Sequence, residues 1–229
     1  MNVSRRLAAV LFDMDGVLVD SEPLWLDVER TIMHGLGARW SRADQQRCVG
    51  GPLRRTAEYM LTSAGLAAHS MTGVAALEQA LIDGMADRLT AAAPLRPGAA
   101  RLLAELAAAD MPTALVTSSY RNLADLVLGH LGHDAVSVSV AGDEVRRRKP
   151  HPEPYLTAAS LLDVDPRDCV VLEDSQPGLA AAAAAGCRCV GVPDTVSIGT
   201  APGLVVIDSL SDIDLPWLYS LAQRLPGAG

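Results

Sequence analysis

The chain has 229 residues, of which 49% are apolar, 3% are aromatic and 20% are charged. This length allows one domain, or a core domain with a smaller inserted one, and the apolar fraction argues against intrinsic disorder. The formal net charge of −8 argues against a nucleic-acid or anionic-membrane surface, because such partners need an excess of lysine and arginine; a small anionic ligand in a local basic pocket stays compatible with it.

The first apolar stretch, residues 7–12 (LAAVLF), follows Arg5 and Arg6 and is interrupted by Asp13 and Asp15. It is too short for a signal peptide or a membrane span, and it suits a buried strand. The four cysteines lack the paired spacing of a zinc site. We therefore expect a cytoplasmic protein whose thiols are reduced and mostly buried.

No convincing strand follows until Pro94. Helical spacing of apolar residues instead marks three segments, at residues 21–36, 52–66 and 73–92. A proline marks one border of this interval, at residues 21–23, and two prolines and a glycine mark the other, at residues 93–98. The pattern predicts a helical domain over residues 21–93, inserted into a core domain formed by residues 1–20 and 94–229.

After Pro94, short apolar runs alternate with helix-like segments. The further candidate strands are residues 113–117, 136–140, 169–173, 189–192 and 204–207. The candidate helices between them are residues 97–110, 119–131, 152–163 and 175–186. Strands that alternate with helices indicate a parallel sheet with helices on both faces. The predicted class is therefore α/β, with a mainly parallel sheet in the core.

Polar residues collect where four of the predicted strands end. These residues are Asp13-Met14-Asp15-Gly16, Thr117-Ser118-Ser119, Lys149, and Glu173-Asp174-Ser175. Each group alone is compatible with a helix cap, a turn or a solvated surface. Ligands of open parallel sheets bind beyond the carboxyl ends of the strands. Together, the four groups therefore indicate one functional site at that edge.

Four carboxylates, those of Asp13, Asp15, Glu173 and Asp174, would be ionised at neutral pH and would repel one another. A divalent cation that prefers oxygen ligands supplies a counter-charge, and Mg²⁺ is commonly held by one or two carboxylates together with a substrate phosphate. We expect Asp13 and Asp174 to be carboxylate ligands of Mg²⁺. The main-chain carbonyl of Asp15 would be a third ligand, and Glu173 would lie close behind them.

Lys149 is the only lysine among the 19 lysine and arginine residues. A phosphate dianion near the carboxylates meets roughly 4 kcal/mol of repulsion per charge pair at about 4 Å and intermediate dielectric. A lysine ammonium can contact a carboxylate and a phosphoryl oxygen together, whereas the planar guanidinium of arginine needs a fork geometry. We expect Lys149 to offset this repulsion, the alternative being a lysine placed there by chance. The hydroxyl and N–H groups of Thr117, Ser118 and Ser119, at a strand-to-helix turn, suit an anion.

Taken together, these motifs resemble those of the haloacid-dehalogenase-like hydrolase superfamily, in the branch of phosphoglycolate phosphatases, sugar-phosphate phosphatases and β-phosphoglucomutase. Residues 12–21 (FDMDGVLVDS) resemble the first motif and residues 115–118 the second. Lys149-Pro150 resembles the third, and residues 173–175 with Gly178 resemble the fourth. The match spans nearly the whole chain. It implies a Rossmann-like core with a helical cap inserted just after the first strand.

The resemblance also implies catalytic roles. Asp13 would attack phosphorus and become an aspartyl phosphate, and Asp15 would protonate the leaving alcohol and then activate water. Mg²⁺ and Lys149 would stabilise charge on the transferring group, while Thr117 would hold a phosphoryl oxygen. Asp15 argues against dehalogenation, since relatives that act on carbon–halogen bonds resemble this motif only at its first Asp. These roles imply a Mg²⁺-dependent phosphomonoesterase acting on a small phosphorylated metabolite.

Substrate choice is expected to lie with the cap, where Arg54 and Arg55 are candidates for a second anionic contact; the alternative is that they are exposed helix charges. The expected substrate contacts are Gly16, Glu22, Gly50, Arg54, Arg55, Ser118 and Ser119. The β-phosphoglucomutase branch resembles this region but has its arginine earlier after the loop glycine, near Pro52 or Leu53, and the cap here has no lysine. Both departures argue against a mutase.

Two alternatives stay open beside the phosphatase. The first is a phosphomutase of the β-phosphoglucomutase type, and the second is a non-catalytic protein that binds a phosphorylated ligand on the same scaffold. The expected partners are limited to a small phosphorylated metabolite, with no nucleic acid and no membrane. We expect a monomer or a weak dimer.

Overall fold

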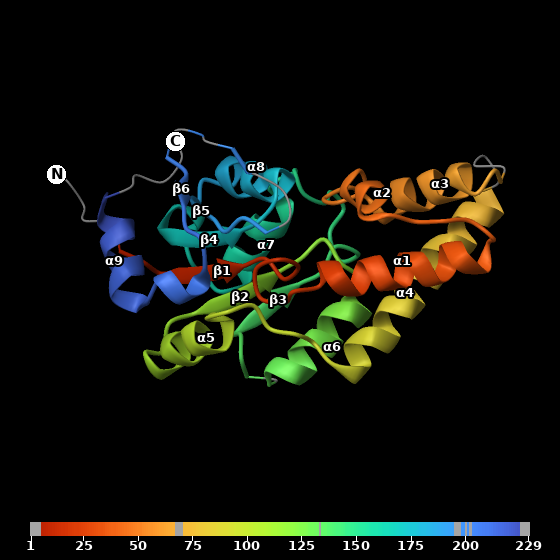
Figure 1. Ribbon diagram of the computed structural model, residues 1–229. Helices are drawn as coiled ribbons and strands as arrows, with labels where there is room; N and C mark the ends of the chain where they lie inside the picture. The colour runs from red at the N-terminus through yellow and green to blue at the C-terminus, as the bar shows by residue number, and fades with distance from the viewer. Residues whose placement is uncertain are drawn as a thin grey trace. The chain divides into compact units, whose positions relative to one another are not determined.

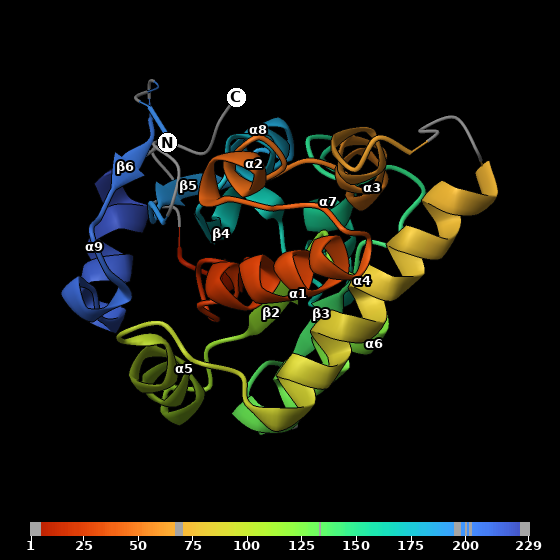
Figure 2. The same cartoon turned by 45° about the vertical axis from the view of Figure 1, so that its right-hand side comes forward.

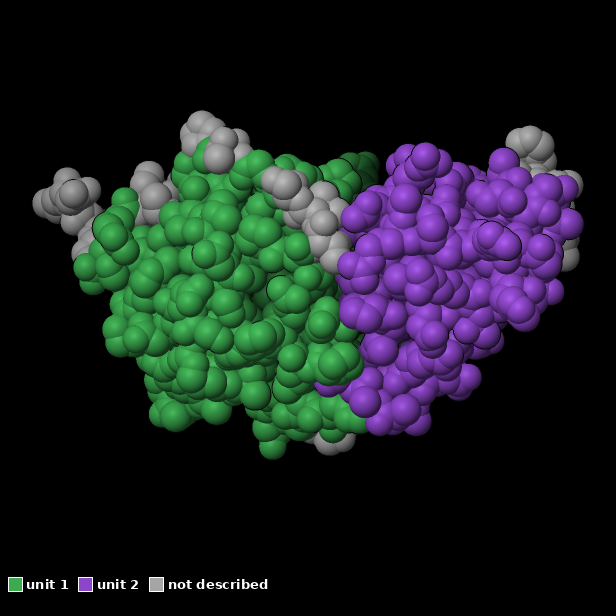
Figure 3. Space-filling model, in the orientation of Figure 1, with its two compact units in different colours: residues 1–20, 94–229 green, residues 21–93 purple. Residues whose placement is uncertain are grey.

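The computed structural model describes residues 6–66, 71–132, 134–194, 198–199, 201 and 203–224. The chain divides into two compact units, coloured green and purple in Figure 3. Unit 1 comprises residues 1–20 and 94–229, and unit 2 comprises residues 21–93. Both units are built around buried apolar cores of their own.

Unit 1 contains a six-stranded parallel sheet in the described part of the chain (Figure 1). Its strands are β1 (Ala9–Phe12), β2 (Thr113–Val116), β3 (Val138–Val140), β4 (Cys169–Glu173), β5 (Arg188–Gly191) and β6 (Val205–Val206). Their spatial order is β3-β2-β1-β4-β5-β6, and every neighbouring pair is parallel. The order reverses between β1 and β4, which is where an open α/β sheet forms its ligand crevice.

Helices cover both faces of this sheet. They are α5 (Ala99–Ala108), α6 (Arg121–Leu131), α7 (Glu153–Leu161), α8 (Gln176–Ala184) and α9 (Leu215–Arg224), with short 3₁₀ turns η1 (Pro166–Asp168) and η2 (Leu210–Asp212). Leu11, Val116 and Val171 pack in one buried cluster with Tyr155 of α7 and Leu179 of α8. Figures 1 and 2 show α5 on the opposite side of the sheet from α8. The predicted α/β class with a parallel, Rossmann-like sheet is confirmed.

Every residue of β1, β2, β4 and β5 is buried. Strands buried on both faces read as continuous apolar runs, which is the pattern that predicted them. The two segments of unit 1 that flank residues 21–93 pair with each other. Asp20 donates its N–H to the carbonyl of Pro94 (2.8 Å), and Arg96 donates its N–H to the carbonyl of Leu18 (2.9 Å). Leu95 forms an antiparallel bridge with Val19.

Unit 2 is helical in its described residues. Its helices are α1 (Glu22–Gly35), α2 (Arg42–Gln46), α3 (Leu53–Ser63) and α4 (Met71–Ala91). Met33, Ala57, Met60 and Leu81 are fully buried in its core. A Cβ on Gly84 of α4 would lie 2.7 Å from a methyl carbon of Val28, so the glycine permits close packing of α4 on α1.

Among the described residues, no helix has both the length and the apolar character to cross a membrane.

The four cysteines are free and buried, and burial raises the pKa of Cys169 and Cys189 to about 12. Because the thiolate is the reactive form, these side chains act as small apolar core residues. Cys189 lies within β5, as its flanking sequence predicts.

Candidate active site

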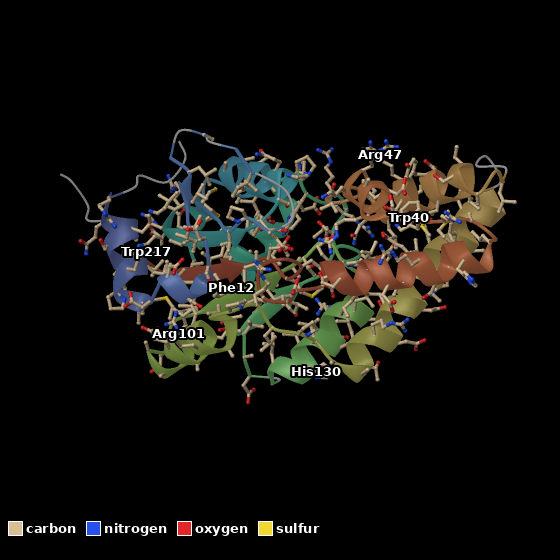
Figure 4. The ribbon with its side chains drawn as sticks, viewed as in Figure 1. Phe12, Trp40, Arg47, Arg101, His130 and Trp217 are labelled. Atoms are coloured by element: carbon tan, nitrogen blue, oxygen red, sulfur yellow. The ribbon has the colours of Figure 1, made fainter. Side chains whose placement is uncertain are left out.

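Asp13 is the first residue beyond the central strand. Figure 4 labels Phe12, which ends β1. Asp13 donates its N–H to the carbonyl of Leu172 (3.0 Å), which continues the β1–β4 ladder by one residue. Because its backbone is fixed in this way, its side chain, which is 9% exposed, lies at the point where the strand order reverses.

Lys149 makes contacts that account for the choice of lysine. Its Nζ donates to Asp13 Oδ1 (2.6 Å), to Glu173 Oε1 (2.6 Å) and to the main-chain carbonyl of Val116 (2.8 Å). Its side chain is only 3% exposed. Three acceptors that converge on one nitrogen match an ammonium group, which has three donors, and do not match a planar guanidinium. Burial disfavours the charged form, but Asp13 and Glu173 outweigh it and raise the pKa of Lys149 above its usual value.

Glu173 is held by hydrogen bonds on both of its oxygens. Oε1 accepts from Lys149 and from the hydroxyl of Tyr155 (2.9 Å), and Oε2 accepts from the N–H (3.0 Å) and the hydroxyl (2.9 Å) of Ser175. A Cβ on Gly178 would lie 1.6 Å from Oε1, so only glycine leaves room for the carboxylate. Glu173 is fully buried and fixed in place. The sequence reasoning missed Tyr155, whose ring centre also lies 4.9 Å from Lys149 Nζ.

Asp174 completes an acidic cluster. One oxygen each from Asp13, Glu173 and Asp174 lie within 4.8 Å of one another. A Cβ on Gly16 would lie 2.3 Å from Asp174 Oδ2, and Gly16 has a φ of +78°, so both the space and the backbone conformation favour glycine there. Burial raises the pKa of Asp13 to about 8 and that of Asp174 to about 9; their carboxylate neighbours act in the same direction, and Lys149 opposes both shifts.

Burial and the neighbouring carboxylates together outweigh the single ammonium group of Lys149 at both aspartates. A divalent cation with oxygen ligands fits this donor set, since it would stabilise the ionised form of both aspartates. Each oxygen of Glu173 already accepts two hydrogen bonds, which leaves Asp13 and Asp174 as the carboxylates best placed to hold a cation. The structure thus brings together Asp13, which follows β1, and Asp174, which follows β4, the two predicted carboxylate ligands of the metal.

The turn after β2 joins the same edge of the sheet. Thr117 is buried, and it donates its N–H to the carbonyl of Val140 (3.0 Å). Ser119 donates its N–H to Thr117 Oγ1 (2.9 Å) and its hydroxyl to Asp15 Oδ2 (2.7 Å), whereas Ser118 is exposed. The first, second, third and fourth motifs therefore meet within unit 1.

The remaining predicted substrate contacts belong to unit 2. Glu22 is the first residue of α1, and Gly50, with a φ of +73°, precedes α3. Arg54 and Arg55 lie exposed in the first turn of α3, where Arg54 Nε is 3.2 Å from Glu58 Oε1. Their contact with a substrate stays a prediction.

Comparison with known proteins identifies the family. The family model for haloacid dehalogenase-like hydrolases matches residues 7–186. The chain belongs to this hydrolase family. The predicted resemblance is confirmed, and the matched range spans the positions of all four motifs.

Relatives of this hydrolase include named phosphatases. Hexitol phosphatase B of Escherichia coli is 32% identical over 196 residues, which cover 84% of this chain and 86% of that protein. The bifunctional riboflavin kinase/FMN phosphatase of Arabidopsis thaliana is 31% identical over 188 residues, and this chain spans about half (48%) of its length. The crystal structure of CbbY from Rhodobacter sphaeroides in complex with xylulose 1,5-bisphosphate has a TM-score of 0.76 and 28% identity, covering 93% of this chain and 99% of that one.

Proposed function

We propose that this hydrolase is a Mg²⁺-dependent phosphomonoesterase that acts on a small phosphorylated metabolite through an aspartyl phosphate on Asp13. One observation carries the proposal. The ammonium group of Lys149 lies 2.6 Å from carboxylate oxygens of both Asp13 and Glu173, and Asp174 adjoins the same cluster. An acidic nucleophile beside a buried cation suits attack on an anionic phosphoryl group, because the cation offsets the repulsion between them.

In the first step, an Asp13 oxygen forms a bond to phosphorus while the bond from phosphorus to the alcohol oxygen breaks. The electron pair goes to that oxygen, and Asp15 supplies its proton. In the second step, a water oxygen attacks phosphorus, Asp15 takes a proton from the water, and the bond between Asp13 and phosphorus breaks. Lys149 offsets the negative charge in both steps, and Thr117 donates its hydroxyl to a phosphoryl oxygen.

Asp13, Asp174 and the main-chain carbonyl of Asp15 would hold Mg²⁺. When bound, this ion supplies positive charge that both stabilises ionised aspartates and attracts the phosphoryl oxygens. Glu173, with both oxygens hydrogen-bonded, would support Lys149 and the ion from behind. Gly16 would leave room for Asp174 next to the substrate.

We further propose that unit 2 is the cap and determines the substrate through Glu22, Gly50, Arg54 and Arg55. Both arginines are exposed and are therefore accessible to an anionic substrate. The phosphatase activities of the named relatives, and the sugar bisphosphate bound to CbbY, favour a phosphorylated sugar or polyol as substrate. The monomeric or weakly dimeric state and the cytoplasmic location stay predictions.

A phosphomutase is the second candidate, because structures of the β-phosphoglucomutase type share this fold. A mutase must grip a second phosphate while the first is transferred; otherwise water takes the aspartyl phosphate. Unit 2 has no lysine, and its Arg54 forms an ion pair with Glu58. Both features disfavour a second phosphate grip by unit 2. A non-catalytic binding protein would not need Asp15 beside the nucleophile.

The test is phosphate release from a panel of phosphorylated sugars, polyols and other small metabolites. We expect release with Mg²⁺, its loss with a chelator, and its recovery on adding Mg²⁺. Asp13→Asn should abolish release, whereas Asp208→Asn, a matched change at an exposed aspartate of unit 1, should leave it unchanged. A mutase would convert a sugar 1-phosphate into the 6-phosphate with little free phosphate. Turnover by Asp13→Asn at the wild-type rate would contradict the proposal.

A further inference from the structure

Asp15 is held by a serine that lies 104 residues away in the chain. The hydroxyl of Ser119 donates to Asp15 Oδ2 at 2.7 Å. We propose that Ser119 is a positioning residue for Asp15, an inference that rests on the proposed function. Ser119 holds Oδ2 and thereby directs the proton-carrying oxygen, Oδ1, toward the leaving group. Ser119 then acts on the reaction through Asp15 and not as a ligand of the substrate.

The backbone of Ser119 is fixed on both sides. Its N–H donates to Thr117 Oγ1 (2.9 Å), and its carbonyl accepts the N–H of Gly142 (2.8 Å). A Cβ on Gly142 would lie 2.2 Å from the carbonyl oxygen of Ser118, so glycine permits this close approach of the two loops. The hydroxyl of Ser119 is therefore presented to Asp15 from a rigid support.

The backbone around Asp15 is also fixed. Asp15 forms a parallel bridge with Val19, and Gly16 donates its N–H to the carbonyl of Val19 (2.8 Å) at a positive φ that favours glycine. These backbone contacts do not set the side-chain torsions of Asp15, and χ2 of an aspartate is broad and nearly two-fold. A directional hydrogen bond is what selects one of its two orientations. Ser119 makes that bond.

The direction of the bond decides where the proton lies. In the arrangement that we propose, the hydroxyl of Ser119 donates to Oδ2, and Oδ1 is the oxygen left to carry the proton of the neutral acid. From there it passes to the alcohol oxygen as the phosphorus–oxygen bond breaks. In the second step, Oδ1 takes a proton from the attacking water as the bond between Asp13 and phosphorus breaks. Holding a catalytic group in its reactive geometry is a recognised source of rate.

This inference changes the expected role of Ser119 at the anion site. Its hydroxyl and its N–H are both used within the protein. Thr117 Oγ1 accepts the N–H of Ser119 and so keeps its own hydroxyl proton for donation to a phosphoryl oxygen. The phosphate contacts expected of the turn therefore fall to Thr117 and to the exposed Ser118.

Two esters with different leaving groups separate positioning from a merely structural role. An alkyl phosphate needs a proton on its departing oxygen, whereas a dinitrophenyl phosphate releases a stable phenolate without one. General acid catalysis contributes about 10²–10⁴-fold, so Ser119→Ala should lower kcat/KM for the alkyl ester by about 10-fold or more. For the dinitrophenyl ester, kcat/KM should change by less than about 3-fold, because phosphorylation of Asp13 then needs no acid.

Pre-steady-state kinetics give a second readout. In Ser119→Ala the weakened base slows hydrolysis of the aspartyl phosphate, so the dinitrophenyl ester should show a burst of phenolate equal to the enzyme concentration. Ser119→Thr, which keeps a hydroxyl, should restore the alkyl ester rate. Ser160→Ala, at an exposed serine of α7, should match the wild type with both esters.

Equal losses with both esters, or no loss with the alkyl ester, would overturn the positioning role. Such results require a wild type that releases phosphate and so leave the phosphatase proposal intact. The double variant of Asp15→Ala with Ser119→Ala gives an independent check. If Ser119 acts through Asp15, adding Ser119→Ala to Asp15→Ala should change kcat/KM for either ester by less than about 2-fold. A further loss comparable to that in the wild-type background would contradict the inference.

Discussion

Replacing Lys149 by arginine keeps the positive charge and changes only the shape of the cation. In the structure, three acceptors lie 2.6–2.8 Å from one nitrogen that is almost fully buried. A guanidinium places its nitrogens in a plane and cannot bring one of them to all three acceptors. We expect Lys149→Arg to fold but to lose at least one of these hydrogen bonds.

The magnitude follows from the two carboxylates. At 2.6 Å and an effective dielectric constant of about 20, each attraction is about 6 kcal/mol before desolvation is subtracted. Removing one partner of a buried ion pair costs about 3–5 kcal/mol net. We therefore expect Lys149→Met to lower the free energy of unfolding by about 3–5 kcal/mol. One lost charge-assisted hydrogen bond in Lys149→Arg should cost about 1.5–3 kcal/mol.

Activity should fall further than stability. Removing one electrostatic donor from a catalytic site typically costs about 10²–10³-fold, so we expect at least this loss of kcat/KM for Lys149→Arg. Urea unfolding and phosphate release with Mg²⁺ measure the two effects. Arg146→Lys, the reverse exchange at an exposed neighbour, is the matched control and should leave both unchanged. The reasoning would be refuted if Lys149→Arg kept wild-type activity within about 3-fold.

Three further predictions concern buried groups. Burial raises the pKa of Glu29 to about 7. The contribution of Glu29 to the free energy of unfolding is therefore complete below about pH 4.5 and is lost as the pH rises through 7. The free energy of unfolding of the wild type relative to Glu29→Gln should fall by about 2–3 kcal/mol between pH 5 and 8.5, and a constant difference in urea unfolding would contradict this. Tyr155→Phe removes one hydrogen-bond donor to Glu173 and should lower the free energy of unfolding by about 1.5–3 kcal/mol, with a several-fold loss of kcat. An unchanged midpoint of thermal unfolding would argue against a stabilising hydrogen bond between Tyr155 and Glu173. Gly178→Ala should force the Glu173 carboxylate to move, which should lower the free energy of unfolding by about 1–3 kcal/mol or more and remove most of the activity. In the control Gly129→Ala the added Cβ meets nothing within 4 Å, so this change should be neutral or stabilising.

The strands were predictable because burial on both faces produces continuous apolar runs. The expected strand at residues 169–173 coincides with β4, and that at 113–117 exceeds β2 by one residue. Helix α2 was not predicted, since its five residues are too few for a periodic pattern; its signal is the capping box of Ser41 and Asp44. Helix α9 was also missed, although Leu218, Leu221 and Ala222 follow a helical spacing toward the core.

At the site, residue identity and strand order predicted which groups meet, but not how they bond. The four motifs converge because the parallel strands share one carboxyl edge. Tyr155 reaches Glu173 because α7 packs over the sheet, and no local pattern around residue 155 reports that packing. Ser119 was expected to bind an anion as part of a strand-to-helix turn. The direction of its hydroxyl depends on Asp15, which is distant in the chain.

The most direct test of the account is to find the covalent intermediate. The enzyme is mixed with Mg²⁺ and its best substrate, quenched in acid during turnover, digested and analysed by mass spectrometry. We predict a phosphoryl group on the peptide that contains Asp13, and its absence from Asp13→Asn. Phosphate release in full turnover with the phosphoryl group on another residue, or with no covalent adduct at any quench time, would contradict the account.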